Sequence, residues 1–154
     1  MKRIVLFIAL ISLFAVGSAM AATAIGVRAG YASDHDSAFF VGGHVKGVEL
    51  TPDIDLVPNV EVAFFNGAKL YAFNGDALYE LSTTDLAGYT PYLGGELGIN
   101  MWSGDGDSNT KLVINLLAGM EKALDERKAL MFELKLGLSD YSPDIKLTAG
   151  LTFF

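Results

Sequence analysis

Apolar and polar residues alternate one by one through most of this chain, and this pattern limits the possible folds more than any other feature of the sequence. Eight segments after residue 21 repeat it, with turn-forming residues between them. In one of them, Leu112, Ile114 and Leu116 occupy alternate positions. Successive side chains of a strand point to opposite faces, so a period of two indicates strands. The sequence therefore predicts an all-β fold whose strands have one apolar and one polar face.

Short connections between the alternating segments predict how the strands pair. Asn66-Gly67 is the strongest signal, because Asn-Gly is the favoured pair of a two-residue hairpin turn. Strands joined by such turns pair antiparallel with their neighbours in sequence. We therefore expect an antiparallel up-and-down meander whose strands cover residues 23–32, 39–46, 56–64, 71–80, 92–102, 111–121, 130–138 and 145–153.

One stretch, residues 117–135, also fits a helix. It is rich in Ala, Glu, Lys, Leu and Met, which all have a high intrinsic helix propensity. An almost helical apolar stripe is formed by Leu117, Met120, Leu124, Met131 and Leu134. We favour two strands, because 112–120 and 130–138 alternate over five positions each and a charged turn separates them. The helical alternative stays open at this point.

The first 21 residues have the parts of an export signal. Lys2 and Arg3 precede an apolar run over residues 4–16, and small residues follow up to Ala21. The apolar run is too short to span a bilayer by itself. The sequence thus predicts a signal peptide over residues 1–21 and a mature domain over residues 22–154. An uncleaved anchor or a buried helix is the alternative.

The composition excludes several classes of protein. The chain has no cysteine, which excludes disulfide frameworks and cysteine-ligated metal sites. Its 18 acidic residues outnumber 11 basic ones, so we expect no nucleic-acid partner. After residue 21, no apolar stretch reaches the ~18 residues of a spanning helix. An exported chain that is 51% apolar is then either soluble or a closed membrane β-barrel, which satisfies its own backbone hydrogen bonds.

The composition of the two faces favours the membrane barrel. One face is almost purely apolar, whereas the other mixes glycine with nearly balanced charges. Side chains fill the interior of an eight-stranded barrel, and charges buried there must pair. We therefore predict that the polar face lines the interior. The predicted interior network comprises Arg28, His44, Lys46, Glu61, Asp76, Glu80, Glu96, Lys111, Glu121, Glu133, Lys135 and Lys146.

The apolar face is expected to contact lipid, because apolar-out and polar-in alternation marks an outer-membrane barrel. Aromatic residues such as Tyr31 and Tyr79 lie near the strand ends, where interfacial girdles are expected. The predicted lipid-facing residues are Ile25, Val27, Val60, Val62, Leu97, Ile114, Leu116, Phe132, Leu134, Leu147, Leu151 and Phe153. In the alternative, a soluble sandwich or barrel turns its polar face to water.

Three short motifs carry a family resemblance. Residues 90–98 resemble a Pro-Tyr-x-Gly-x-Gly-x-Gly strand, residues 74–79 an Asn-x-x-Tyr strand, and residues 151–154 an aromatic barrel-assembly signal. On these motifs the chain resembles the small outer-membrane β-barrels of the opacity-protein, OmpA-barrel and OmpX type. Two positions depart from the pattern: Glu96 stands where that family often has glycine, and Phe154 lies one residue beyond the outward-facing parity.

The resemblance implies an eight-stranded antiparallel transmembrane β-barrel in the outer membrane of a Gram-negative cell. It also implies membrane lipid, lipopolysaccharide and the barrel-assembly machinery as partners. A surface ligand is not identified by the sequence.

The sequence offers little chemistry. Residues 105–109 resemble the start of an EF-hand calcium loop, but Thr110 replaces the required glycine and Leu116 the bidentate glutamate. His35 and Ser37 lie beside aspartates, although adjacent loop residues rarely hold the hydrogen-bonded chain that nucleophilic hydrolysis needs. We therefore predict no catalytic, cofactor-binding or metal-binding residue and no enzymatic activity.

The function expected from these observations is that of a small outer-membrane barrel with a side-chain-filled lumen, which has a structural or surface-interaction role and is not a pore. Two other functions stay open: a soluble periplasmic β-barrel that binds an apolar ligand, and a lipid-modifying barrel enzyme. The aspartates of the loops at 33–37, 103–109 and 139–144 bind divalent cations, attract a cationic partner, or simply form turns and keep the rim soluble.

Overall fold

All regular structure in the described part of this chain is β-strand. The computed structural model describes residues 24–33, 37–65, 67–81, 86–104 and 107–154, so the predicted signal peptide, residues 1–21, lies outside the described residues. The prediction of an all-β chain is confirmed. The strands are β1 (Ala24–Ser33), β2 (Ser37–Lys46), β3 (Val48–Thr51), β4 (Ile54–Phe65), β5 (Ala68–Glu80), β6 (Thr90–Gly104), β7 (Asp107–Asp125), β8 (Lys128–Gly137) and β9 (Ile145–Phe153).

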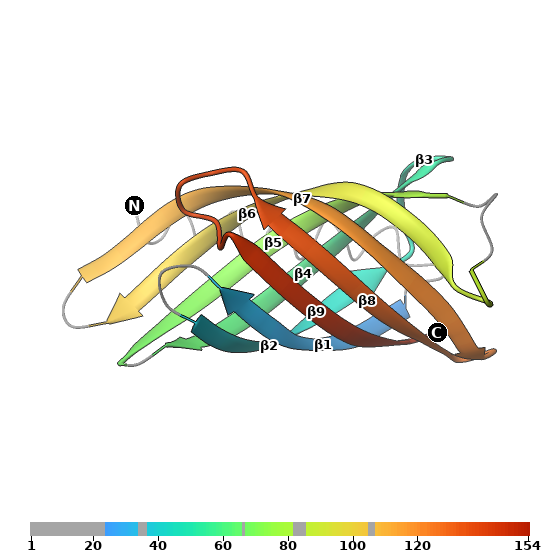
Figure 1. Cartoon of the computed structure of the whole chain (residues 1–154), viewed down its shortest axis with the longest axis horizontal. Helices are drawn as coiled ribbons and strands as arrows, with labels where there is room; N and C mark the ends of the chain where they lie inside the picture. Colours follow the sequence, from blue (N-terminus) through green and yellow to red (C-terminus); the bar gives the residue numbers. More distant parts are fainter. Residues whose placement is uncertain (1–23, 34–36, 66, 82–85, 105–106) are drawn as a thin grey trace.

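The strands form one antiparallel sheet that closes on itself. Neighbours follow the order β2-β1-β9-β8-β7-β6-β5-β4-β3, and β2 also pairs with β4. The first strand thereby joins the last, with Val27 opposite Leu151. The β2–β4 pair, with Val41 opposite Val62, closes the remaining gap. The result is the predicted barrel, whose strands cross its long axis obliquely (Figure 1).

A bulge at Gly47 explains why the eight-stranded wall contains nine strand segments. His44 of β2 is opposite Asn59, and Val48 of β3 is opposite Leu56. Four steps along β2 and β3 thus match three steps along β4, so one residue is extra. Gly47 sits between the two segments with a φ of 96°, which glycine adopts without steric cost. β3 is therefore the continuation of β2.

The region that also fitted a helix forms the predicted pair of strands. β7 and β8 pair antiparallel, with Leu117 opposite Lys135 and Ala118 opposite Leu134. The turn between them is stabilised by Asp125, whose Oδ1 accepts a hydrogen bond of 2.7 Å from the Arg127 backbone N–H. Strand pairing overrides the helix propensity, because it turns Leu116 and Leu134 to one face and Leu117 and Lys135 to the other.

The connections divide between the two ends of the barrel. The ends at which β1 meets β2, β4 meets β5, β6 meets β7 and β8 meets β9 lie together at one end of the barrel, which we call the loop end. The β3–β4, β5–β6 and β7–β8 connections lie at the other end together with the last residue, and we call this the terminal end (Figure 1).

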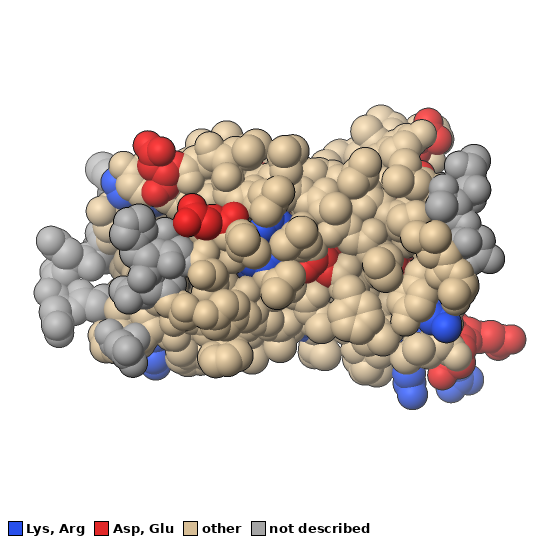
Figure 2. All heavy atoms as spheres, viewed as in Figure 1, with Lys and Arg blue, Asp and Glu red and all other residues tan. Residues whose placement is uncertain are grey.

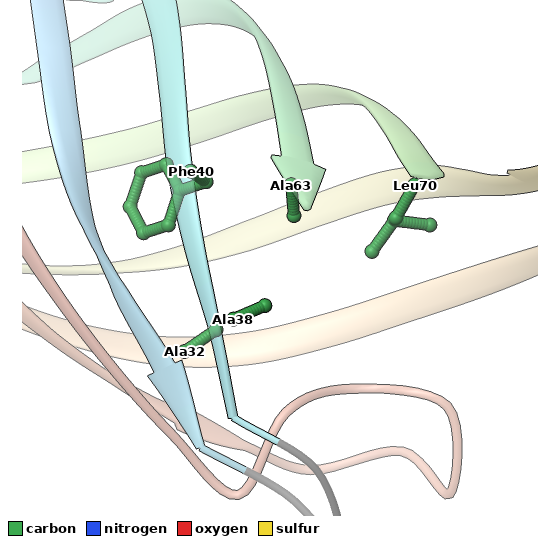
Figure 3. Packing of buried hydrophobic residues seen from close by; sticks show 5 residues of the cluster. All are labelled: Ala32, Ala38, Phe40, Ala63 and Leu70. Carbon is green, nitrogen blue, oxygen red and sulfur yellow. The ribbon is translucent and has the colours of Figure 1, made fainter. Parts of the chain in front are cut away.

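Two apolar clusters occupy the inside of the barrel at different heights. The first lies at the loop end and consists of Ala32, Ala38, Phe40, Ala63 and Leu70 (Figure 3). Phe65 and Trp102 pack against it. The second, nearer the terminal end, consists of Val57, Leu78, Tyr92 and Leu117. Along β5 the inward-facing residues run from Leu70 through Asn74 and Asp76 to Leu78. Polar side chains therefore occupy the level between the two apolar clusters.

Candidate functional site

A group of buried charges occupies the middle of the barrel. The residues, which we call the lumen cluster, are Arg28, Glu61, Asp76, Glu96, Glu133, Lys135 and Lys146. They come from β1, β4, β5, β6, β8 and β9, and each stands at an inward-facing position of its strand. Strand alternation and barrel closure bring them together, although they are far apart in sequence.

Arg28 joins three strands through its guanidinium group. Its Nη1 lies 3.5 Å from Glu61 Oε1 and 3.4 Å from Asp76 Oδ2. Its Nη2 lies 3.7 Å from Glu133 Oε1. The side chain is buried, so water does not screen these pairs as it would at a surface.

Lys135 makes the closest ion pairs described for the carboxylates of β5 and β6. Its Nζ lies 2.8 Å from Asp76 Oδ2 and 2.6 Å from Glu96 Oε2. Glu133 Oε1 lies farther away, at 3.8 Å. Lys135 and Asp76 are completely buried, which makes this pair the most enclosed part of the lumen cluster.

The remaining carboxylate contacts come from a third cation and from uncharged groups. Lys146 donates a hydrogen bond to Glu61, and the Asn115 amide donates one to Glu96. The Tyr92 hydroxyl donates to Glu133 Oε2 at 3.1 Å. Each carboxylate of the lumen cluster therefore has at least one donor, as buried charges require.

Two further polar pairs lie toward the terminal end. His44 Nε2 is 2.8 Å from Thr152 Oγ1, with Gly26 between them in the sheet. Lys46 Nζ is 2.7 Å from both carboxylate oxygens of Glu121. The second pair is only part-buried, so it lies at the edge of the interior.

Two of the residues predicted for the interior network lie at or beyond its ends, with no described contact to the lumen cluster. Glu80, the last residue of β5, is exposed to solvent. Lys111 stacks its Nζ over the Tyr141 ring, 4.2 Å from the centroid, on the loop-end side of β7. Alternation gives both residues inward-facing parity, but their strands extend past the closed part of the barrel. The alternation of the sequence therefore shows which face of a strand a residue occupies, but not where the residue lies along the barrel axis.

Several uncharged polar residues of the interior were missing from the predicted network. Asn74 Nδ2 donates to Asn59 Oδ1 at 3.0 Å, and Asn115 and Tyr92 bind carboxylates of the lumen cluster. Their inward-facing parity was the available signal, because all of them stand on the polar face.

The outer wall is apolar. The residues predicted to face lipid all lie at outward-facing positions, and Ile25, Leu97 and Leu116 are 60%, 58% and 52% exposed. Aromatic residues form a row near the loop end, where Tyr31 is opposite Phe39 and Phe39 is opposite Phe64. Figure 2 shows a largely uncharged wall, with a few charged atoms near the middle of this face and others toward the two ends.

The described residues contain no group of three or more His, Cys, Asp or Glu side chains that could hold a metal ion. His35 and residues 105–106 lie outside the described part of the chain, so the hydrolytic and calcium-like segments are not described as a whole. No helix within the described ranges is long and apolar enough to cross a membrane.

Comparison with known proteins agrees with this fold. No protein-family model matches the sequence, and no curated protein matches it. The chain is similar in structure to Neisserial surface protein A, with a TM-score of 0.62 and 18% identity, over 85% of this chain and 94% of that one. It is also similar to the N-terminal β-barrel domain of Pseudomonas aeruginosa OprF, with a TM-score of 0.62 and 16% identity, over 84% and 96% of the two chains.

A third similar structure is a designed protein. A transmembrane β-barrel made by de novo design matches with a TM-score of 0.51 and 18% identity, over 85% of this chain and 92% of that one. At these identities the likeness concerns the fold. The predicted resemblance to small eight-stranded outer-membrane barrels is confirmed at that level.

Proposed function

We propose that this chain is a small outer-membrane β-barrel protein with a structural or surface-interaction role. In this proposal residues 1–21 are a cleaved signal peptide and residues 22–154 form the barrel. The observation that carries the proposal is the polarity of the wall, which is apolar outside and ionic inside. A water-soluble barrel has the reverse order, with its apolar face packed on the core.

The outward-facing side chains argue against a soluble protein. Large apolar residues on several strands are 39–53% exposed, among them Leu93, Leu116, Leu134 and Leu147. Soluble monomers rarely expose contiguous apolar patches of more than a few hundred Å². The hydrocarbon of a bilayer covers such a wall without cost. The proposed partners are therefore membrane lipid and lipopolysaccharide, with the barrel-assembly machinery inserting the chain.

The interior argues against the soluble alternative in a second way. A soluble barrel that binds an apolar ligand needs an apolar central cavity. Here the lumen cluster occupies the middle of the barrel, with Lys135 and Asp76 fully buried. A ligand of that kind would have to displace paired charges, which is strongly unfavourable.

The same interior supports a lumen that does not conduct. A cavity of about 30 Å³ at the loop-end side of the lumen has Phe40, Glu61 and Lys146 among its lining residues. That volume holds a water molecule or two, because one water needs roughly 10–15 Å³ by this measure. Apolar side chains pack above and below the lumen cluster. We therefore propose that the barrel is not a pore.

A non-enzymatic role fits the arrangement of the buried groups. The carboxylates of the lumen cluster are all buried, and each of them contacts a cation, an amide or a phenol hydroxyl. A general acid or base has to reach the proton that it transfers, directly or through one water. Substrates outside the barrel cannot approach Glu96 or Asp76 in this way.

Detergent-dependent folding tests the proposal. The mature chain, refolded from urea into detergent micelles, should migrate differently in gels before and after boiling, because the folded barrel resists the gel detergent. In cells, the protein should stay with the outer-membrane fraction after a carbonate wash. Release by that wash, together with folding in buffer alone, would show that the chain is a soluble barrel.

Conductance provides a separate test of the lumen. Folded protein in a planar bilayer should give no stepwise conductance, whereas a general porin in the same bilayer supplies the positive control. Reproducible channel openings by the wild-type chain would contradict the filled lumen and would leave the membrane location untouched.

A further inference from the structure

The few charges on the outer wall have an unequal distribution. Among the described strands, the outward-facing positions carry three lysines, Lys69, Lys122 and Lys128, and one carboxylate, Asp125 at the end of β7. Lys69 lies near the loop end, opposite Phe64. Lys122 and Lys128 lie at the terminal end, on β7 and β8. The wall therefore has two adjacent cations at one rim.

Strand register places the two terminal-end lysines next to each other. Lys122 is opposite Leu130 on β8, and Lys128 lies two residues before Leu130 on the same face. Such diagonal neighbours lie roughly 7–8 Å apart, with a somewhat smaller distance between their Cβ atoms, which is within reach of long side chains. An anion between the two ammonium groups could therefore contact both.

A strained turn brings an aromatic ring to this place. Leu86 and Tyr89 exchange backbone hydrogen bonds of 3.2 and 3.1 Å, and Ala87 and Gly88 between them have φ angles of 58° and 83°. A positive φ costs an alanine roughly 1–2 kcal/mol. The turn sets the Tyr89 ring beside Lys122, whose Nζ lies 5.0 Å from the ring centroid. Backbone strain of this kind often marks a functional position.

The two ammonium groups have no carboxylate bound to them in the described part of the chain. Asp125 is opposite Lys128, but its Oδ1 accepts the Arg127 backbone N–H instead. Apolar side chains, including Phe153 opposite Lys128, cover the wall beside them. The surface thus offers cations at the rim and an apolar wall below, which matches an amphiphile with an anionic head.

We propose that Lys122 and Lys128, with Tyr89 beside them, bind the headgroup of an anionic phospholipid in the leaflet at the terminal end of the barrel. The inference rests on the proposed membrane location. Lysines near a membrane surface contact lipid phosphates while their stems lie along apolar surface. Tyrosine at the headgroup level is the usual companion of such sites.

Native mass spectrometry of the folded barrel tests the site. The protein in nonionic micelles would receive equal amounts of phosphatidylglycerol and phosphatidylcholine with the same acyl chains. The wild type should retain phosphatidylglycerol in preference to phosphatidylcholine. A double variant, Lys122→Gln with Lys128→Gln, should lose most of that preference, at about fivefold per lysine. The matched control is Lys69→Gln, which removes an outward-facing lysine at the loop end and should leave the preference unchanged.

The outcomes separate this inference from the proposed function. Boiling-dependent gel mobility reports whether each protein has folded, so a wild type that never folds in micelles counts against the membrane barrel itself, and only variants that fold enter the comparison. A folded double variant that keeps the wild-type preference would overturn the lipid site alone, as would an equal loss in Lys69→Gln. Displacement of the lipid by inorganic phosphate at matched ionic strength would overturn the assignment to a lipid.

Discussion

Asp76 and Glu96 lie directly opposite each other on β5 and β6, and Lys135 Nζ bridges their carboxylates at 2.8 and 2.6 Å. Like charges at opposite positions of neighbouring strands repel each other, and burial strengthens that repulsion. The lysine is therefore the group that allows two adjacent strands to place carboxylates toward the same point. Its absence would leave both carboxylates buried together.

Replacing Lys135 should lower the stability of the barrel strongly. Lys135→Met keeps much of the side-chain volume but leaves Asp76 and Glu96 without their shared cation. Breaking a buried ion pair by removing one partner costs about 3–5 kcal/mol. The free energy of unfolding, measured by urea titration of the protein in lipid vesicles, should fall by that amount.

The matched control for this variant is Lys111→Met. Lys111 contacts the Tyr141 ring at the loop end rather than a buried carboxylate, so its loss should change the free energy of unfolding by less than about 1 kcal/mol. Equal stability of Lys135→Met and the wild type would mean that the lumen cluster is not required for folding.

Replacing Asp76 should destabilise the barrel less than replacing Lys135. The lumen cluster has four carboxylates and three cations, so Asp76→Asn leaves three of each. The amide still accepts a hydrogen bond from Arg28 or Lys135 through its oxygen. We expect Asp76→Asn to cost less unfolding free energy than Lys135→Met in the same urea titration. The reverse order would contradict the assignment of Lys135 as the organising charge.

The His44 ring packs in the space that a side chain at position 26 would fill, so Gly26 is required there. A Cβ atom at Gly26 would lie 2.2 Å from the His44 ring and 2.8 Å from the Leu151 carbonyl oxygen, so Gly26→Ala must move the ring away from Thr152. Overpacking of this kind typically costs about 1–3 kcal/mol. Gly43→Ala, whose Cβ would meet only the Gly26 oxygen at 3.5 Å, is the control and should be nearly neutral. The urea midpoints of the two variants, refolded into the same vesicles, measure the difference.

The wall and the antiparallel order of the barrel were predictable from the sequence because period-two alternation determines both. The same parity placed Arg28 and Lys135 inward without any knowledge of their partners. The alternation could not predict where a residue lies along the barrel axis. Glu80 and Lys111 have inward parity but lie outside the cluster, since strand ends extend past the closed part of the barrel.

The contacts inside the lumen could not be predicted from the sequence either. Which cation meets which carboxylate depends on the stagger of strands that are distant in sequence, such as β1 and β5 for Arg28 and Asp76. The bulge at Gly47 belongs to the same class of feature. The sequence there shows one glycine among many, and only the pairing of β2 and β3 with β4 identifies the extra residue.

The membrane placement that we propose for the wall predicts a position-dependent cost of charge. Leu116 lies on the outer wall near the middle of β7, whereas Leu138 follows β8 at the loop end. Arginine at the midplane of a barrel wall costs about 2–4 kcal/mol, and near an interface about 0–1 kcal/mol. Leu116→Arg should therefore lower the free energy of unfolding in vesicles far more than Leu138→Arg. Similar effects of the two substitutions would place both residues at the same depth.

The bulge at Gly47 should be needed for the join between β2 and β3. With a φ of 96°, Gly47 has a backbone conformation that an alanine adopts only with strain, so Gly47→Ala should destabilise the barrel by about 1–2 kcal/mol. Gly75→Ala is the control, because its Cβ would lie 3.6 Å from Leu56 Cδ1, an ordinary contact. Hydrogen exchange of the β3 and β4 amides should accelerate in Gly47→Ala alone. Unchanged exchange at β3 would show that the strand reaches β4 without the glycine, and that closure depends on the β2–β4 ladder by itself.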